Sequence, residues 1–316
     1  MLAGDRVILS QAITLVESRL PSDQELAEQV LAGCMHRTGN SFRIGITGVP
    51  GVGKSTFIDA FGMHLVEQGA KLAVLAVDPS SQRTRGSILG DKTRMANLVL
   101  DKRAYIRPSP AGETLGGVTR STRETILLCE AAGYDTLFVE TVGVGQSETA
   151  VHSMVDFFLL LMLSGAGDEL QGIKKGIVEL ADGVVINKAD GDNLLRAKKA
   201  RTEYQKALHL LSPPRAGWTP KVLTCSSLER SGMEGIAEML EKYRGGMQTS
   251  GEWSENRRQQ AREWMKDTIL TLLEDRFFQH EAVKERLTQL DEEVIAGKIA
   301  PTSAAKSLIR LYLQGL

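Results

Sequence analysis

The sequence predicts an α/β fold in which a mostly parallel central sheet is flanked by helices, with a helical segment before it and a helical arm after it. Two observations predict it. From residue 41 onward, short apolar runs alternate with helical patterns, which is typical of a parallel sheet covered on both faces. At Arg43–Thr56, the first apolar run leads into a glycine-rich turn and then a helix, the context that a phosphate-binding loop requires.

The turn after the first predicted strand matches the spacing Gly-x-x-x-x-Gly-Lys-Ser. Glycines let the backbone curl so that its N–H groups point at phosphate oxygens, and the next helix adds its positive end. Lys54 is expected to reach the β- and γ-phosphates, and the Ser55 hydroxyl to bind Mg²⁺. The alternative is a glycine-rich turn without a ligand, but both flanks fit the phosphate loop. The predicted loop comprises Gly48, Val49, Pro50, Gly51, Val52, Gly53, Lys54, Ser55 and Thr56.

The apolar and helical patterns define the order of elements along the chain. Predicted strands are Arg43–Thr47, Lys71–Asp78, Ala104–Arg107, Thr136–Glu140, Phe157–Leu163, Gly183–Asn187 and Lys221–Thr224. Predicted helices between and after them include Lys54–Gln68, Thr119–Ala132, Leu194–Leu211 and Met233–Arg244. Such sheets bind ligands at the carboxyl ends of their strands, where Asp78, Glu140, Asn187 and Cys225 are expected.

Three segments are expected. Residues 1–40 form a helical segment in which Pro21 ends one helix and Ser22 or Asp23 caps the next. Residues 41–246 form the sheet-containing domain, and a Gly/Ser-containing break from Gly245-Gly246 to Gly251 marks its end. Residues 247–316 are helical again. The helices expected there are Ser254–Gln279, Glu281–Gly297 and Thr302–Leu313.

Composition narrows the class of protein. The 316 residues are 42% hydrophobic, and 38 Lys and Arg balance 39 Asp and Glu, giving a formal charge of -1. This balance, with only 5% aromatic residues, argues against nucleic acid or an anionic membrane as a partner. No apolar run reaches the roughly 20 residues of a membrane helix, and no signal peptide is evident. The three cysteines lack metal-ligand spacing, so buried free thiols in a cytoplasmic protein are expected.

The run Asn187-Lys188-Ala189-Asp190 follows an apolar strand and indicates guanine. Guanine presents two donors on one edge, and the Asp190 carboxylate can accept both, whereas the lone pair of adenine N1 would repel it. Asn187 can bond the opposite edge of the base and tie this loop to the phosphate loop, while the Lys188 stem lies over the base. Cys225, Ser226 and Ser227 match the weaker loop that closes over guanine through backbone N–H groups. The alternative is a polar turn whose Asp caps the next helix.

Several polar residues are candidates for the metal and the γ-phosphate. Glu140 can hold Mg²⁺, and the Gly143 N–H can sense the γ-phosphate. Gln146 does not directly follow that glycine, so its catalytic role is open and hydrolysis without a partner is expected to be slow. Asp78 and Asp91 offer further carboxylates, with ordinary caps as the alternative. A polar insertion at residues 165–176 carries Lys174 and Lys175, which either swing toward the phosphates or are solvated.

Several longer stretches together resemble the MeaB/ArgK (MMAA-like) family of P-loop GTPases, over nearly the whole chain. They are Gly48–Thr56, Val77–Ser81, Gly86–Met95, Val139–Glu148, Gly167–Gly176 and Asn187–Asp190. The runs Glu-Thr-Val-Gly-Val-Gly-Gln-Ser-Glu and Asp-Glu-Leu-Gln-Gly-Ile-Lys-Lys-Gly are not general features of GTPases, which makes the resemblance specific.

The resemblance implies a GTP-hydrolysing chaperone of an adenosylcobalamin-dependent acyl-CoA mutase of the methylmalonyl-CoA mutase type. Such a protein gates cofactor loading and protects the mutase, which stimulates hydrolysis in turn. It also implies a homodimer held partly by residues 252–316, and a third switch at Gly167–Gly176 that favours an active Lys175. The implied catalytic set is Lys54, Glu140, Gln146 and Lys175. The alternatives are a kinase acting on a transport-linked protein, and a nucleotide-gated scaffold.

Overall fold

The computed structural model describes residues 1–18, 20–77, 95–108, 115–141, 147–164, 175–211 and 217–315. The chain divides into two compact units, Met1–Gln260 and Ala261–Leu316. No helix within the described ranges is both long enough and apolar enough to cross a membrane.

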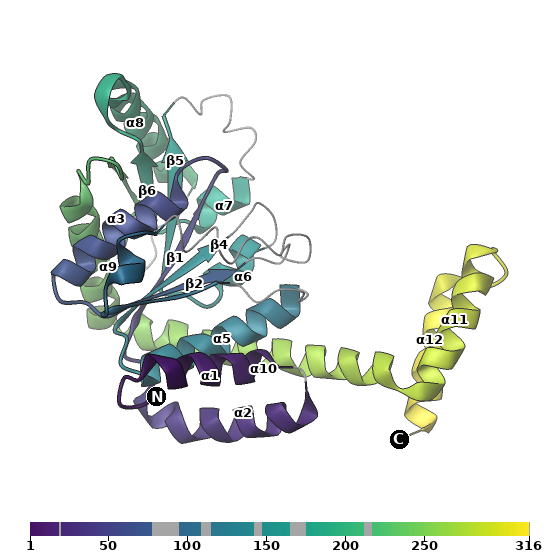
Figure 1. The fold of residues 1–316 in the computed structure, drawn as a ribbon. Helices are drawn as coiled ribbons and strands as arrows, with labels where there is room; N and C mark the ends of the chain where they lie inside the picture. Colours follow the sequence, from purple (N-terminus) through teal and green to yellow (C-terminus); the bar gives the residue numbers. More distant parts are fainter. Residues whose placement is uncertain are drawn as a thin grey trace. The chain divides into compact units, whose positions relative to one another are not determined.

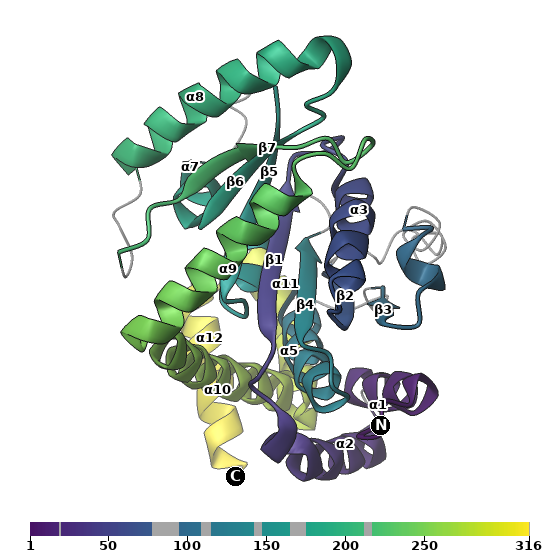
Figure 2. The same cartoon turned by 90° about the vertical axis from the view of Figure 1, so that its left-hand side faces the viewer.

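The first unit (Figure 1) is built on a seven-stranded sheet whose order, β3-β2-β4-β1-β5-β6-β7, can be followed in Figure 2. All six pairings between neighbouring strands are parallel, as the alternation of strands and helices predicts. The strands are β1 (Phe42–Gly48), β2 (Leu72–Val77), β3 (Ala104–Arg107), β4 (Thr136–Thr141), β5 (Phe157–Leu163), β6 (Gly183–Asn187) and β7 (Lys221–Thr224). The bounds of β3, β5, β6 and β7 are those the sequence predicted.

Both faces of the sheet are covered, which explains why its strands are apolar on both sides. Helices α3 (Lys54–Glu67) and α9 (Met233–Ser250) cover one face, where Phe57 and Ile236 share a core with β1. The other face is covered by α5 (Leu115–Ala131), α6 (Ser147–His152), α7 (Lys175–Leu180) and α8 (Leu194–Leu211). Figure 2 shows α3 and α9 with the sheet from the side. The fold class is therefore confirmed.

Two amino-terminal helices, α1 (Arg6–Glu17) and α2 (Pro21–Cys34), pack outside α5, and Glu17 of α1 pairs with Arg107 of β3. The expectation that Ser22 or Asp23 caps the second helix is wrong. The helix begins at Pro21, before either predicted cap, because proline has no N–H to lose in the first turn, and Leu20 takes the capping position. Asp23 instead accepts a hydrogen bond from the Ser18 hydroxyl at 2.6 Å.

Helix α9 continues through Gly245-Gly246, where the sequence suggested a break, and ends at Ser250. The buried side chains of Tyr243 and Met247 lie on either side of the two glycines and keep this part of the helix in the core. Packing therefore outweighs the low helix propensity of glycine. Gly251 follows with φ 79°, a left-handed conformation that suits glycine and ends the helix.

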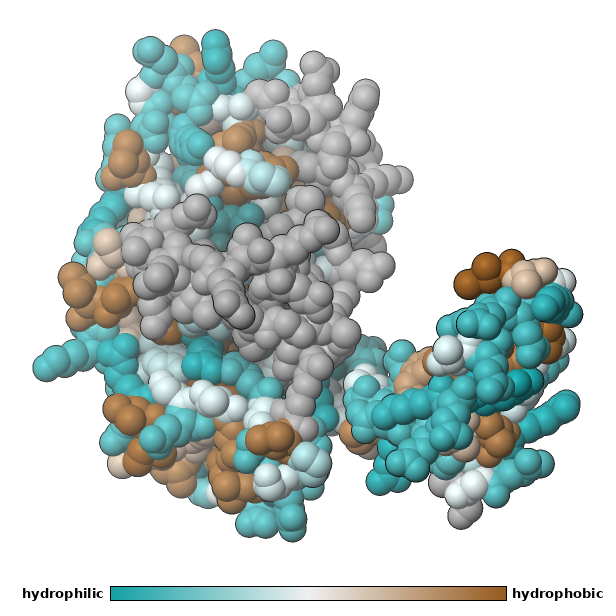
Figure 3. Space-filling model, turned by 45° about the vertical axis from the view of Figure 1, so that its right-hand side comes forward, coloured by the Kyte–Doolittle hydropathy of each residue, from teal (hydrophilic) through white to brown (hydrophobic). Residues whose placement is uncertain are grey.

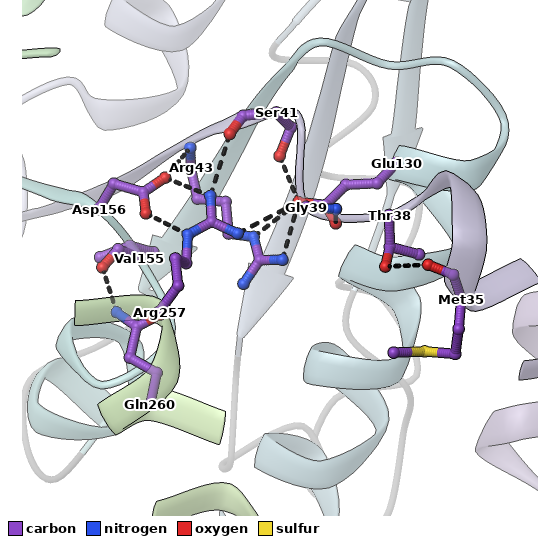
Figure 4. A network of polar contacts seen from close by, with 10 residues as sticks. All are labelled: Met35, Thr38, Gly39, Ser41, Arg43, Glu130, Val155, Asp156, Arg257 and Gln260. Carbon is purple, nitrogen blue, oxygen red and sulfur yellow. Dashed lines mark hydrogen bonds and ion pairs between the residues drawn. The ribbon is translucent and has the colours of Figure 1, made fainter. Parts of the chain in front are cut away.

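A buried network of ion pairs lies at the amino-terminal ends of the central strands β1 and β5 (Figure 4). Arg257, in the first turns of α10 (Glu252–Gln279), pairs with Asp156 just before β5 and donates to the Ser41 carbonyl at 3.0 Å. Its guanidinium also lies 3.5 Å from Glu130 of α5, which pairs with Arg43 of β1 at 2.8 Å. The network joins the start of α10 to three elements of the first unit.

The second unit contains the rest of α10, with α11 (Glu281–Ile295) and α12 (Pro301–Gln314). Its core is small and consists of Val283, Leu290, Ala304 and Leu308, with Phe277 and Tyr312 packed beside it. Trp253 and Trp264 precede this core in the sequence, and Trp253 packs on Phe42 at 5.7 Å between ring centroids.

Candidate nucleotide site

The predicted phosphate loop joins the carboxyl end of β1 to the first residue of α3. Gly51 and Gly53 have φ values of 79° and 87°, which side chains other than glycine rarely adopt. Gly48 is required for another reason, because a Cβ there would lie 2.6 Å from the Leu161 carbonyl of the neighbouring strand. The loop conformation therefore depends on each of the three glycines.

Helix α3 begins at Lys54 with Gly53 at the capping position and no side-chain cap. The first N–H groups of a helix lack partners within the helix, so this end is suited to an anion. Ser55 and Thr56 lie in this first turn, half-buried and exposed respectively. The structure thus provides the helix terminus that the motif predicts beside the loop amides.

Lys54 bridges the two ends of the loop. Its ammonium donates a hydrogen bond to the Gly48 carbonyl at 2.9 Å. Burial lowers the pKa of Lys54 below its ordinary value, and the carboxylates of Glu140 and Glu148 oppose this by favouring the charged form. A cation held at this place, close to two acids, is suited to neutralising phosphate charge.

The guanine motif is tied to the phosphate loop, as predicted. Asn187, at the end of β6, donates from Nδ2 to the Val52 carbonyl at 2.9 Å across 135 residues of sequence. Its Oδ1 accepts from the hydroxyl and the N–H of Ser227, at 2.8 Å and 3.2 Å, and from the Cys225 thiol at 3.4 Å. One buried amide therefore fixes three predicted segments of the site relative to one another.

The two polar residues after Asn187 also contact predicted site segments. Lys188, at φ 59°, donates from Nζ to the Gly51 carbonyl at 2.8 Å. Asp190 accepts a hydrogen bond from the Ser226 hydroxyl, and the Cys225 backbone accepts from Ala189 N–H at 2.9 Å. Burial raises the pKa of the Cys225 thiol to about 12, so Cys225 acts here as a neutral packed group.

On the metal side the structure describes Glu140 but not all of its predicted neighbours. Glu140 is 3% exposed in β4, paired in register with Ile46 of β1 and Ala76 of β2. Beside it the Thr141 hydroxyl donates to Thr47 at 2.8 Å. The predicted residues Asp78, Asp91, Gly143 and Gln146 lie outside the described residues, as does Lys174; Lys175 begins α7, but its side chain is outside them too.

The Ser55 hydroxyl and the Glu140 carboxylate fit the oxygen ligands that Mg²⁺ prefers. No group of three or more His, Cys, Asp or Glu side chains within the described residues forms a metal cluster. A site that shares its metal with substrate phosphates needs only one or two protein ligands, so the donor set agrees with Mg²⁺ in that role.

Sequence reasoning assigned no role to Glu148, which the structure places in α6 at 2% exposure and close enough to Lys54 to influence its charge. The available signal was its place in the run Gly-Gln-Ser-Glu. Asn193 was also missed. It donates to the Lys188 carbonyl at 2.6 Å and accepts from Ser164, and so supports the guanine loop from the far side.

The loop, the helix terminus and the tethered Asn-Lys-x-Asp run define a P-loop GTPase. Comparisons with known proteins agree. The sequence model of a family described as "Methylmalonyl Co-A mutase-associated GTPase MeaB" matches residues 9–282. The chain belongs to this family and is a GTPase.

Relatives and a solved structure cover most of the chain. A probable GTPase of Mycobacterium tuberculosis is 51% identical over 308 residues, which are 98% of this chain and 92% of the relative. The GTPase ArgK of Escherichia coli is 53% identical over 83% of this chain and 80% of its own, and the mouse methylmalonic aciduria type A homolog is 46% identical over 99% and 78%. A crystal structure titled "LAO/AO transport system kinase" matches with TM-score 0.77 and 41% identity, covering 99% of this chain and 95% of that one.

Proposed function

We propose that this GTPase binds an adenosylcobalamin-dependent acyl-CoA mutase of the methylmalonyl-CoA mutase type, gates loading of its cofactor and protects it. The observation that carries the proposal is the family match over residues 9–282, whose description names association with methylmalonyl-CoA mutase. The mouse relative, named for methylmalonic aciduria, supports the same partner. A cytoplasmic location is part of the proposal.

In the proposed reaction water attacks the γ-phosphate of GTP in line with the leaving diphosphate. The loop amides of Gly48–Gly53 and the start of α3 hold the phosphates, and Lys54 stabilises the charge that develops on them. Ser55 and Glu140 and, among residues outside those described, Asp78 or Asp91 would hold Mg²⁺, which would neutralise negative charge on the phosphates. Gly143, Gln146 and Lys175 are proposed to complete the site on the γ-phosphate side.

The guanine end of the site is proposed to work through Asp190, which accepts from the base, and through Asn187 and Lys188, which place the loop. The hydrogen bond from Ser226 orients the Asp190 carboxylate before guanine arrives. Preorganisation of this kind reduces the cost of binding. Because Asn187 holds Val52 and Ser227 together, base recognition and phosphate binding share one rigid element.

We infer that the protein is a homodimer and that α10, α11 and α12 form the arm that joins the copies. The second half of α10 supports this, because several of its large apolar side chains are 45–66% exposed within the described chain. They are Met265, Ile269, Leu270, Leu272 and Leu273. Exposed apolar residues gathered on one helix mark an interaction surface rather than a solvated one.

The experiment that tests the function combines purified protein, Mg²⁺, GTP and a methylmalonyl-CoA mutase. Slow phosphate release that the mutase accelerates, and that Lys54→Ala abolishes, is the expected result. Mutase that neither binds the protein nor changes the rate would overturn the proposed partner. Phosphate found on a protein or small molecule, rather than free in solution, would favour phosphotransfer instead.

A further inference from the structure

Helix α8 carries a local excess of positive charge in a chain that is nearly neutral as a whole. Its eighteen residues, Leu194–Leu211, contain five Lys and Arg and one acid, against a formal charge of -1 for the full sequence. The acid, Glu203, lies 3.9 Å from Lys199, and both side chains are exposed. A helix whose only function is to cover the sheet has no need of such an imbalance on its outer side.

Three of the five Lys and Arg of α8 line one side of the helix. A hollow of about 930 Å³ is lined, among the described residues, by six side chains that recur at helical spacing: Lys198, Arg201, Thr202, Gln205, Lys206 and His209. We call these six residues the α8 stripe. None of the six residues is acidic. Within the described part of the chain, Lys198, Arg201 and Lys206 have no ion-pair partner. The side chains at the top of Figure 3, where α8 lies in Figure 1, are mostly hydrophilic.

The helix that carries the α8 stripe is held in place by hydrogen bonds and packing. Gln205 accepts from the Val222 N–H at 2.9 Å and donates to the Pro220 carbonyl at 3.1 Å. These bonds hold α8 against the edge strand β7, and Ala197, Tyr204 and Leu208 bury its inner side. The charges are therefore presented by a rigid helix, which lowers the entropy lost when a partner binds.

The stripe is also close to the guanine loop along the chain. Asn193, the residue directly before α8, bonds the Lys188 carbonyl, and Asp190 lies four residues before the helix. The stripe therefore lies on the helix that directly follows the predicted base-reading loop.

We propose that the α8 stripe is a docking surface for an acidic, carboxylate-bearing face of the mutase; the inference rests on the proposed function, which supplies the partner. Lys198, Arg201 and Lys206 of the stripe span nine residues of helix, roughly 13 Å. A small anion needs donors that converge on one point, whereas a row of exposed cations of this length fits a row of carboxylates on a protein. Contacts of this kind steer association and set orientation.

The test uses two double variants of the full-length protein that make the same chemical change. Lys198→Glu with Arg201→Glu reverses the stripe, while Lys199→Glu with Arg196→Glu reverses two exposed cations of α8 outside the hollow. Both pairs replace one Lys and one Arg, so composition and net charge are identical. GTP hydrolysis without the mutase should be unchanged in both, since neither pair belongs to the nucleotide site.

Mutase affinity, measured by calorimetry or interferometry, should fall about tenfold or more for the stripe variant at about 0.05 M salt, and much less for the matched variant. The difference in mutase affinity between the two variants should be smaller at about 0.5 M salt, where exposed charges are screened. Equal affinity of both variants, with the wild type binding the mutase, would overturn the inference alone. A wild type that does not bind the mutase would overturn the proposed function and the inference with it. Loss of binding to a duplex oligonucleotide in the stripe variant only, with mutase binding intact, would assign the stripe to nucleic acid instead.

Discussion

At the scale of single residues, Asn187 connects the loops of the candidate site through its hydrogen bonds. Its amide contacts the carbonyl of Val52 and three groups of the Cys225–Ser227 segment, and it is 1% exposed. A buried amide with all of these partners specifies one arrangement of the loops, because any other arrangement would leave polar groups without hydrogen bonds.

Asp190 is proposed to select the base, and the change Asp190→Asn tests this. We expect the preference for GTP over ATP to fall by about a hundredfold or more, because the amide cannot accept from both donors of guanine. Binding of labelled GTP with ATP as competitor measures it. Asp192→Asn is the matched control, since Asp192 is an exposed acid two residues further along the chain. An unchanged preference in the Asp190 variant would remove this residue from base recognition.

Glu130 is expected to make the stability of the folded protein depend on pH. Burial raises the pKa of its carboxyl, but Arg43 and the hydrogen bonds from Arg43, Ser41 and Gly39 outweigh burial and lower the pKa below 4.5. A depressed pKa in the folded state stabilises the fold at neutral pH, and this stabilisation is lost as pH falls through the folded-state value. We expect the free energy of unfolding of the wild type to decrease as the pH is lowered past about 4.5. In Glu130→Gln the same decline should be shallower, and denaturant titrations at several pH values measure both. Parallel pH profiles for the two proteins would contradict the prediction.

At the scale of elements, the network around Arg257 holds the start of α10 against the other elements of the first unit. The side chain contacts Asp156, Glu130 and the Ser41 carbonyl, and Gln260 adds a bond to the Val155 carbonyl at 2.6 Å (Figure 4). Charges of both signs are present and hydrogen-bonded, which is the condition under which a buried network is tolerated.

Arg257→Met should lower the free energy of unfolding by about 3 kcal/mol, because it leaves two buried carboxylates short of a partner. Urea unfolding measures it. The neighbouring Arg258→Met is the control: Arg258 pairs with Glu255 at 62% and 57% exposure, and an exposed pair contributes about 0–1 kcal/mol. If the two variants lose the same stability, the network does not hold α10 as described.

At the scale of the whole molecule, the proposed association with a second copy rests on the exposed apolar side chains of α10. Light scattering of the wild type should report twice the mass of one chain. Leu270→Glu with Leu273→Glu, at 66% and 54% exposure, should shift the protein to one chain, because charges at a buried interface are costly. Arg262→Glu with Lys266→Glu adds the same acids to the same helix without removing apolar surface, and should remain dimeric. A wild type with the mass of one chain would contradict the dimer.

The sequence by itself determined the fold class and the class of enzyme, a P-loop GTPase. The phosphate loop and the Asn-Lys-x-Asp run are short motifs, so their spacing is readable along the chain, and apolar runs buried on both faces marked four strands to the residue. Tertiary structure alone decided the rest. It carried α9 through Gly245-Gly246, brought Glu148 near Lys54, and joined Arg257 to Asp156 across 101 residues. These outcomes depend on packing and charge pairing between distant segments, and no local pattern contains that information.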